Sequence, residues 1–325
     1  MARWGIMGAG RIAVDLTEAI REAGGEVLAI GSASPERAEA FGASHDIPHR
    51  YGTHEAVARD PDVDVVYVAS TNDAHLRHTL ASIEAGTPVL CEKPFALNAH
   101  QAREMIAKAR ARGVFLMEAM WMRFHPATDR LLDLLASGRI GQVRSVRADF
   151  GFPAAPHPSN RLFDPTLGGG TILDLGVYVV TLATMVLGAP SDVSAKIERS
   201  DAGVDLQAGI VLRHPGGVST LSTSFVSDAG NEAIVSGTDG RIRLHAPFHH
   251  SPMLTIEHRG QITETIRTRP AGSDYRPEVD EVHRCLRNGL AESPKWPLHD
   301  TLAVMEVLDR IRAGVGVAFP DEDRS

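Results

Sequence analysis

The sequence predicts two domains: an α/β domain on a doubly wound parallel sheet, then an α+β domain with a large, mostly antiparallel open sheet. Up to about residue 120, short apolar runs alternate with segments of helical periodicity. The runs are apolar on both faces, as expected of strands that helices cover on both sides. After residue 140, glycine-containing turns such as "RHPGGV" and "SGTDGR" separate strand-like segments.

The first domain, residues 1–121, is expected to hold five strands and at least two crossover helices. The helices are expected at 73–85 and 99–112, where apolar residues recur on one face, and Asn98 is placed to cap the second. Strands are expected at 4–7, 27–30, 63–69, 89–91 and 114–117.

The second domain, residues 122–325, is expected to form mainly strands, with helices near 170–187, 277–289 and 299–313. Two strands in 253–266 surround a turn at Arg259-Gly260. The other strands are expected at 143–150, 192–199, 206–213, 218–226 and 241–244. The boundary at 121/122 rests on this change of pattern, because no low-complexity linker separates the two parts.

Composition restricts the class of protein. The chain has 325 residues and a formal net charge of -8, which argues against a nucleic-acid partner. Only Cys91 and Cys285 are present, which fits a reduced compartment better than a disulfide framework. The N-terminus lacks the pattern of a signal peptide, and no apolar run approaches the ~18 residues of a membrane span. We therefore expect a soluble, cytoplasmic protein without a membrane partner.

A glycine motif follows the first predicted strand. "GAGRIA" supplies Gly8, Ala9, Gly10, Arg11 and Ile12, and then Ala13 as the small third residue of a G-x-G-x-x-A pattern. In a dinucleotide-binding fold the first glycine permits the turn, the second lets the backbone approach a pyrophosphate, and the helix N-terminus faces the phosphates. The alternative is a tight turn with small packing residues. The strand before it and the helix after it favour nucleotide binding.

The end of the second strand indicates which nucleotide is preferred. An acidic residue there typically holds the ribose 2′-hydroxyl of NAD. This chain instead has Ser32 and Ser34, followed by Arg37. Hydroxyls and a guanidinium suit a 2′-phosphate, so NADP is the expected cofactor, with NAD as the alternative. Arg37 is otherwise a solvated helix residue.

Polar residues also stand at the ends of the third and fourth strands, Thr71-Asn72 and Glu92-Lys93-Pro94. Ligands of such sheets bind at this edge. Oxidising an alcohol by hydride transfer releases the hydroxyl proton, and reducing a carbonyl requires one. An ammonium desolvated beside an oxidised nicotinamide can exchange a proton near neutrality. We therefore expect Lys93 to be catalytic, aimed by a turn that Pro94 restricts.

A second group of polar residues lies in "GGGTILDLGVY". On one continuous helix, Asp174 and Tyr178 are four residues apart and share a face. A carboxylate and a phenol on that face can flank the same substrate oxygen as Lys93. The alternative is a structural aspartate and a core tyrosine.

Four motifs together resemble the Gfo/Idh/MocA oxidoreductases: "GAGRIA", "THEAVARDPDVDVVYVASTNDAH", "GTPVLCEKPFALN" and "GGGTILDLGVY". The resemblance spans nearly the whole chain and is strongest to the branch of dihydrodiol dehydrogenases and NADP-dependent D-xylose dehydrogenases. It implies a Rossmann domain, a second domain with an open sheet, and homodimers or homotetramers that pair through that sheet. Dihydrodiol dehydrogenases have an additional arginine near the end of the second strand, where this chain has Ala33, which leaves more of the phosphate recognition to Arg37.

The resemblance also implies roles for individual residues. Tyr178 is the main acid/base candidate, with Lys93 lowering the pKa of its hydroxyl electrostatically, although the two roles can be reversed. Asp174 becomes an active-site residue, and His75 shapes the nicotinamide pocket. Candidates for contact with a sugar or cyclic diol substrate, by stacking or hydrogen bonding, are Trp121, Arg123, Phe150, Phe152 and Arg161; each is otherwise a packing residue.

No metal is expected, because His245, His249 and His250 lie in one loop without partners at ligand spacing. The favoured function is an NADP-dependent dehydrogenase or reductase acting on a sugar or cyclic diol. A related enzyme acting on inositol, 1,5-anhydrofructose or a nucleotide sugar is the first alternative. A non-catalytic nucleotide-sensing regulator is the second, and it has no need of a proton-transfer set.

Overall fold

The chain folds into two compact units in a computed structural model, which describes residues 1–155, 157 and 160–320. The first unit consists of Met1–Phe124 and Pro270–Leu302, and the second of His125–Arg269 and the chain from Ala303 onward. The units are therefore discontinuous in sequence, whereas the sequence suggested a single boundary at 121/122. The segment Pro270–Leu302 packs with the first unit although it lies late in the chain.

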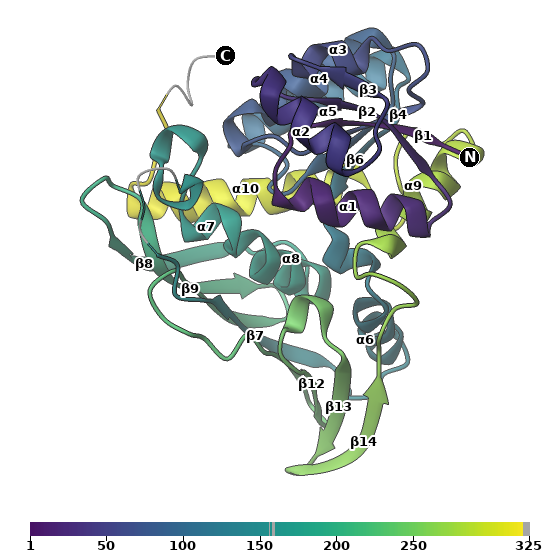
Figure 1. The fold of residues 1–325 in the computed structure, drawn as a ribbon. Coiled ribbons are helices and arrows are strands. Elements are labelled where there is room, and N and C mark those ends of the chain that lie inside the picture. The colour runs from purple at the N-terminus through teal and green to yellow at the C-terminus, as the bar shows by residue number, and fades with distance from the viewer. Residues whose placement is uncertain (156, 158–159, 321–325) are drawn as a thin grey trace. The chain divides into compact units, whose positions relative to one another are not determined.

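The first unit is built on the parallel sheet that the sequence predicts (Figure 1). Its strand order, β3-β2-β1-β4-β5-β6, is that of a dinucleotide-binding Rossmann domain. The strands are β1 (Arg3–Met7), β2 (Glu26–Gly31), β3 (His49–Tyr51), β4 (Val65–Val68), β5 (Val89–Glu92) and β6 (Leu116–Ala119). β3 was not predicted from the sequence, because its three residues, His-Arg-Tyr, form no apolar run.

Helices cover this sheet. Within the first unit, α4 packs on both α3 and α5, and α1 packs on α9. The Asn98 side chain caps α5 as predicted, accepting from the Gln101 amide at 2.8 Å. The helices are α1 (Arg11–Glu22), α2 (Pro35–Ser44), α3 (His54–Ala58), α4 (His75–Ala85), α5 (Ala99–Arg112) and α9 (Arg276–Arg287), with short 3-10 turns η1 (Asn72–Ala74) and η2 (Trp121–Phe124).

Buried hydrogen bonds attach the late segment to the first unit. The Trp4 indole donates to His283 Nε2 at 3.0 Å. Glu118 Oε2, at the end of β6, accepts from the Trp296 indole at 3.0 Å and from the Thr301 hydroxyl at 2.9 Å. All five side chains are buried. These contacts explain why a helix predicted for the second domain, α9, belongs to the first unit.

The second unit is built on an eight-stranded sheet in the order β14-β13-β12-β11-β7-β10-β9-β8. Only β7 and β10 pair in parallel, so the sheet is mostly antiparallel, as predicted. The strands are β7 (Val143–Gly151), β8 (Asp192–Arg199), β9 (Asp205–His214), β10 (Gly217–Ser224), β11 (Ala233–Gly237), β12 (Arg241–Leu244), β13 (Met253–His258) and β14 (Gln261–Arg267).

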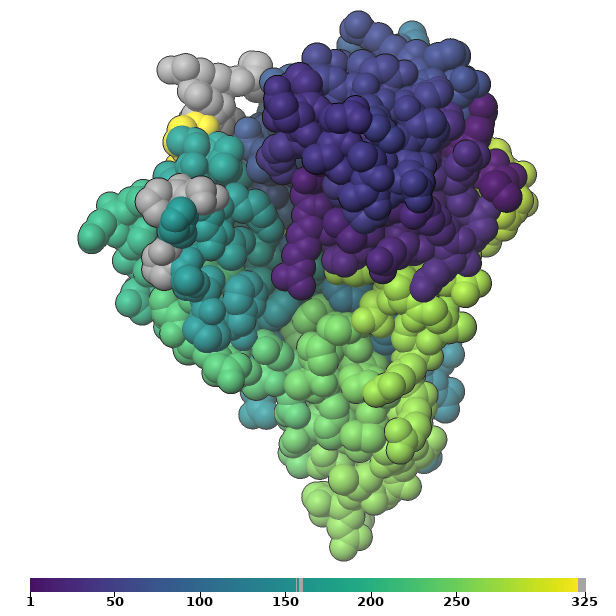
Figure 2. All heavy atoms as spheres, in the orientation of Figure 1, coloured from purple at the N-terminus to yellow at the C-terminus, as the bar shows by residue number. Residues whose placement is uncertain are grey.

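The predicted turn between the last two strands is present. Arg259 and Gly260 both have positive φ, 49° and 81°, as a two-residue type I′ turn requires. The tip of this β13–β14 hairpin extends from the rest of the second unit in Figures 1 and 2. The helices of this unit are α6 (Pro126–Ala136), α7 (Thr171–Asp174) and α8 (Gly176–Leu187), with short turns η3 (Arg161–Phe163), η4 (Pro165–Leu167) and η5 (Phe248–His250). A further helix, α10 (Leu298–Val315), begins in the first unit and continues into the second.

In the described part of the chain, no single helix has the length and hydropathy to cross a membrane. Among the described helices, only the bent pair 165–174 and 176–187 is long and apolar enough when its two parts are taken together. The first two turns of α8 are buried in the second unit. Large apolar side chains are exposed on neighbouring strands of the second sheet, at Val211 in β9 and Val218 in β10.

Glu118 is predicted to weaken the fold as the pH rises. Burial raises its pKa from 4.5 to about 7, against the opposing hydrogen bonds from Trp296 and Thr301. Between these values the folded chain binds more protons than the unfolded chain, so the free energy of unfolding falls as the pH rises. A glutamine side chain at this position does not titrate. Urea titrations measure the free energy of unfolding of the Glu118→Gln variant and of the wild type. The variant value minus the wild-type value should therefore rise by about 3 kcal/mol between pH 4 and pH 8.

Glu281 is the matched control, since it is also buried in the first unit. Burial raises its pKa, but hydrogen bonds from Arg284 and Ser293 outweigh burial and hold the pKa below its ordinary value. The Glu281→Gln variant should therefore change relative to wild type in the opposite direction over the same pH range. Equal changes in the two variants would contradict the account of Glu118.

Candidate active site

The glycine turn between β1 and α1 has two different requirements for glycine. Gly8 has a φ of 121°, and a Cβ there would lie 2.5 Å from the Ala69 carbonyl oxygen. Its amide donates to the Gly31 carbonyl at 2.8 Å, which ties the turn to β2. Gly8 is therefore needed for the turn itself.

Gly10 is different, because it has an ordinary φ of -97° and no atom lies within 4 Å of where its Cβ would be. Packing within the chain does not require a glycine there. Gly10 is the N-cap of α1, and it has no side chain that could cover the helix N-terminus. Arg11, the first helical residue, is exposed. This open N-terminus fits a pyrophosphate, whose close approach a Cβ would obstruct.

The end of β2 holds the residues predicted to select the cofactor. The exposed Arg37 guanidinium donates to the Ala9 carbonyl at 3.0 Å, so it lies directly beside the glycine turn. Ser32 is buried and accepts from the Ser34 amide at 3.3 Å. The Ser34 hydroxyl caps α2, accepting from the Arg37 amide at 3.2 Å, and donates to Glu36 at 2.7 Å. Glu36 is a nearby carboxylate that the sequence analysis did not consider.

The turn after β5 carries Lys93, and neighbouring residues hold it on both sides. The Lys93 amide donates to Glu92 Oε2 at 3.0 Å. On the other side, His75 Nδ1 lies 2.9 Å from the Pro94 carbonyl oxygen, and His75 Nε2 lies 3.1 Å from that of Ser70. The Lys93–Pro94 peptide bond is cis. His75 thus links the ends of β4 and β5.

The remaining predicted residues of the first unit lie at the same edge of the sheet. Thr71 and the buried Asn72 follow β4 at the start of η1. Trp121, in η2 after β6, is buried, and its ring lies 4.8 Å from that of Tyr275. Arg123, in the same turn, is half-buried. The sequence analysis missed Tyr275, because it is far from Trp121 in sequence.

In the second unit, the predicted helix from 170 to 187 is in fact two helices. The chain bends by 43° between the segment ending at Asp174 and α8, which begins at Gly176. Asp174 and Tyr178 are therefore on different helices, and the argument from one continuous helical face was wrong. Gly176 begins the second helix, and glycine has a low helix propensity.

Asp205 in β9 fixes the start of α7. Its carboxylate accepts from the Ile172 amide at 2.6 Å and from the Thr171 hydroxyl at 3.0 Å. A Cβ on Gly170, whose φ is 124°, would collide with this carboxylate. Burial raises the pKa of Asp205 to about 6, although these hydrogen bonds favour its charged form. Asp205 was not predicted, since nothing in the local sequence links it to the glycine-rich segment.

Two of the predicted residues form an ion pair. Arg161 Nη2 donates to Asp174 Oδ1 at 3.0 Å, and the arginine side chain is 42% exposed whereas the aspartate is 8% exposed. The Asp174 carboxylate is thus held by a guanidinium that still reaches solvent. Phe152 is exposed, at 37%, on the segment after β7.

Tyr178 is buried, and its ring lies in an aromatic group of the second unit. The Phe150 ring lies 5.4 Å from it and the His249 ring 5.2 Å. His249 also stacks on Phe150, with 4.4 Å between centroids and 23° between planes. From the sequence, His249 was considered only as a metal ligand. Its position beside Tyr178 was not predicted, because η5 is about 70 residues from Tyr178 in sequence.

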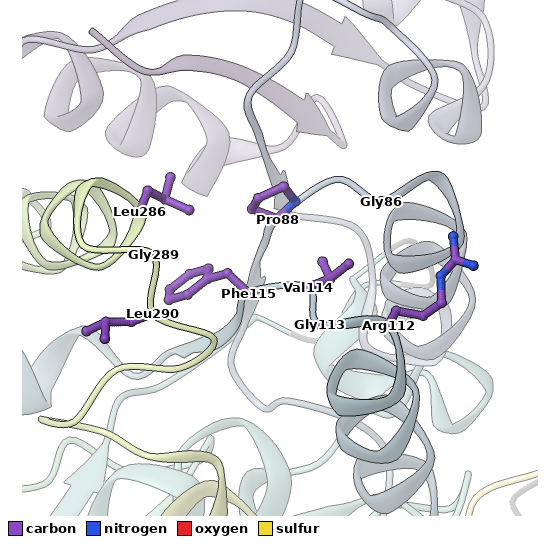
Figure 3. Close-up of a pocket in the computed structure, with 9 residues that line it drawn as sticks. All are labelled: Gly86, Pro88, Arg112, Gly113, Val114, Phe115, Leu286, Gly289 and Leu290. Atoms are coloured by element: carbon purple, nitrogen blue, oxygen red, sulfur yellow. The ribbon is translucent and has the colours of Figure 1, made fainter.

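Neither a metal site nor the cavity drawn in Figure 3 accounts for these residues. Within the described residues, no group of three or more His, Cys, Asp or Glu side chains can hold a metal ion. A cavity of about 340 Å³ lies at the amino ends of β5 and β6, the edge of the sheet opposite to Lys93 (Figure 3). Its one charged lining residue, Arg112, donates to the Glu84 carbonyl at 3.0 Å.

Family models match both parts of the chain. Residues 2–120 match the model described as "Oxidoreductase family, NAD-binding Rossmann fold", and residues 128–243 match the GFO/IDH/MocA C-terminal domain. The chain belongs to the GFO/IDH/MocA oxidoreductases. It is accordingly an oxidoreductase with a nicotinamide-nucleotide-binding domain.

Relatives within the GFO/IDH/MocA family cover nearly the whole chain. The mouse (Mus musculus) trans-1,2-dihydrobenzene-1,2-diol dehydrogenase is 38% identical over 336 residues, covering 99% of each chain. The human (Homo sapiens) enzyme of the same name is 36% identical, with the same coverage. Among solved structures, KijD10, a 3-ketoreductase from Actinomadura kijaniata in complex with NADP, is 27% identical with a TM-score of 0.85, covering 97% of this chain and 98% of its own.

The glycine turn gives the first test of the nucleotide site. Gly10→Ala should fold as stably as the wild type, because its Cβ meets no atom of the chain, yet bind NADPH at least about 10-fold more weakly, because the Cβ obstructs the phosphates. Thermal unfolding and fluorescence titration with NADPH measure the two effects.

Gly8→Ala is the matched control. It places a Cβ against the Ala69 carbonyl at a positive φ, so it should lower the thermal midpoint by several degrees. A Gly10→Ala protein that binds NADPH as tightly as the wild type would show that the phosphates do not lie at this helix.

Proposed function

We propose that the protein is an NADP-preferring dehydrogenase that interconverts a hydroxyl and a carbonyl group on a cyclic diol. The observation that carries this proposal is the identity of 36–38% to dihydrodiol dehydrogenases over nearly the full length. The aromatic group of Phe150, Tyr178 and His249 is consistent with a cyclic substrate, because aromatic side chains pack well against the face of a ring.

A related sugar substrate is the second candidate. It is supported by the 3-ketoreductase KijD10 and by an aldose-aldose oxidoreductase from Caulobacter crescentus, which is 25% identical with a TM-score of 0.86. Trans-1,2-dihydrobenzene-1,2-diol and D-xylose, each supplied with NADP⁺, distinguish the two candidates by the rate of NADPH formation. Membership of an oxidoreductase family favours either enzyme over a non-catalytic regulator.

The nicotinamide cofactor accepts or supplies the hydride, and the chain's own residues manage the proton. In the oxidative direction the Tyr178 phenol, as its phenolate, takes the substrate hydroxyl proton. The Lys93 ammonium stabilises that phenolate and the developing oxyanion. The Arg161 guanidinium, held by Asp174, donates to the second hydroxyl of the diol and fixes its orientation. The proposal requires Lys93 and Tyr178 to reach the same oxygen.

Removing either proton-transfer group should stop turnover without removing the nucleotide. Lys93→Ala and Tyr178→Phe should each lower kcat by at least about 10³-fold, at the upper part of the range for a general acid–base group. The dissociation constant for NADPH, measured by fluorescence titration, should stay within about threefold of wild type. Undiminished turnover in both variants would remove the assigned roles.

Cofactor preference is proposed to depend on Arg37, with Glu36 acting against it. The guanidinium beside Ala9 favours a 2′-phosphate, whereas a carboxylate next to it repels that phosphate. Arg37→Ala should therefore lower the ratio of kcat/KM for NADP⁺ over NAD⁺ about 10-fold or more, and Glu36→Gln should raise it. A ratio that neither variant moves would place the 2′ position elsewhere.

A further inference from the structure

The main chain at Lys93 depends on a buried contact between two neighbouring strands. Glu92, the last residue of β5, accepts from the Lys93 amide through Oε2 at 3.0 Å. Its other oxygen, Oε1, accepts from the hydroxyl of Tyr67 in β4. Tyr67 is fully buried and Glu92 is 6% exposed. A single carboxylate therefore joins β4 to the first peptide of the catalytic turn.

The negative charge of Glu92 affects the buried titratable side chains around this contact. Burial, reinforced by the charge of Glu92, raises the pKa of Glu278 well above its ordinary value and that of Glu118 to about 7. Burial and then Glu92 likewise raise the pKa of Tyr67 well above 10, so its hydroxyl remains a donor. Glu92 accepts two hydrogen bonds, which favour its ionised form. Besides burial, the charge of Glu92 thus raises the pKa of both neighbouring acids.

Such a contact is expensive for the fold alone. Burying a carboxylate and a hydroxyl costs several kcal/mol even when they bond to each other, and an apolar pair of the same volume is commonly as stable or more so. The other β4 side chains, Val65, Val66 and Val68, are apolar and fully buried. A phenylalanine would continue this pattern at position 67, so the hydroxyl is best explained by its effect on the turn.

We propose that Tyr67 is a positioning residue for Lys93. Its hydroxyl fixes the Glu92 carboxylate, and the carboxylate fixes the peptide from which the Lys93 side chain extends. The inference rests on the proposed function, in which the ammonium acts on the substrate oxygen. His75 holds the Pro94 carbonyl on the other side of the turn, so losing Tyr67 alone loosens the turn without releasing it.

The Tyr67→Phe variant tests this role. A displacement of about 1 Å at a catalytic group can cost up to about 100-fold in rate, so kcat should fall about 10- to 100-fold. The substrate KM and the dissociation constant for NADPH should stay within about twofold, because the nucleotide and substrate contacts remain. A kcat within twofold of wild type in a folded Tyr67→Phe protein would overturn the proposal.

Tyr51→Phe is the matched control. The Tyr51 hydroxyl also donates to a buried carboxylate of the first unit, Asp60, at 3.1 Å, but Tyr51 lies on β3, which β2 and β1 separate from β4. It should lower kcat less than twofold. If Tyr67→Phe does not fold, Glu92→Ala replaces it, because alanine removes the acceptor of both hydrogen bonds. An unchanged kcat in this variant would equally overturn the proposal.

A double variant separates positioning from a general effect on the structure. If Tyr67 acts through Lys93, then Tyr67→Phe should not lower the residual single-turnover rate of Lys93→Ala any further. An additional loss of 10-fold or more would show that Tyr67 acts by another route. An active Lys93→Ala protein would remove the role that the proposed function assigns to Lys93. An inactive Lys93→Ala beside a fully active Tyr67→Phe would remove only this inference.

Discussion

The buried Glu92 carboxylate accepts two hydrogen bonds at the end of β5, one from the Tyr67 hydroxyl and one from the Lys93 amide. These bonds fix the main chain from which the Lys93 side chain extends. A charged group at the end of a buried strand is stable only when it is paired or hydrogen-bonded. Here the pairing comes from the strand next to it and from the following peptide. His75 completes the arrangement by contacting the carbonyls of Ser70 and Pro94. Hydrogen bonds thereby hold the polar edge of an otherwise apolar sheet at Lys93, whose ammonium is proposed to stabilise the phenolate and the developing oxyanion.

The same edge collects the other residues of the first unit that are proposed to contact the nucleotide. Gly8 and Gly10 lie at the end of β1, and Arg37 reaches back from α2 to the Ala9 carbonyl. Local geometry explains Gly8 fully but leaves Gly10 without an internal reason, and the proposed approach of a pyrophosphate would supply that reason. The turn that Gly8 permits and the open helix N-terminus at Gly10 therefore lie at the same edge of the sheet as Arg37.

Much of this was predictable from the sequence, because parallel strands and their connecting helices have strong local patterns. The capped helix at Ala99–Arg112, the turn at Arg259-Gly260 and the family itself were predicted and are confirmed. What was missed depends on contacts between distant residues. Trp296 and Thr301 reach Glu118 across about 180 residues, and this attaches a late segment to the first unit.

The second unit shows the same limit. The spacing of Asp174 and Tyr178 suggested one helical face, but the chain bends between them, and Asp205 fixes the first of the two helices from another strand. His249 packs on Tyr178 from a loop that the sequence marked only by its histidines. Pairing of copies through the second sheet stays a prediction.

The central claim is that an amine and a phenol act together on one carbon–oxygen bond beside the nicotinamide. A crystal structure of the protein with NADP⁺ and a non-reactive diol analogue tests it most directly. The account predicts Lys93 Nζ and the Tyr178 hydroxyl both within about 3.2 Å of the same analogue oxygen. An analogue oxygen that contacts neither group, or contacts them only one at a time in separate regions, would contradict it.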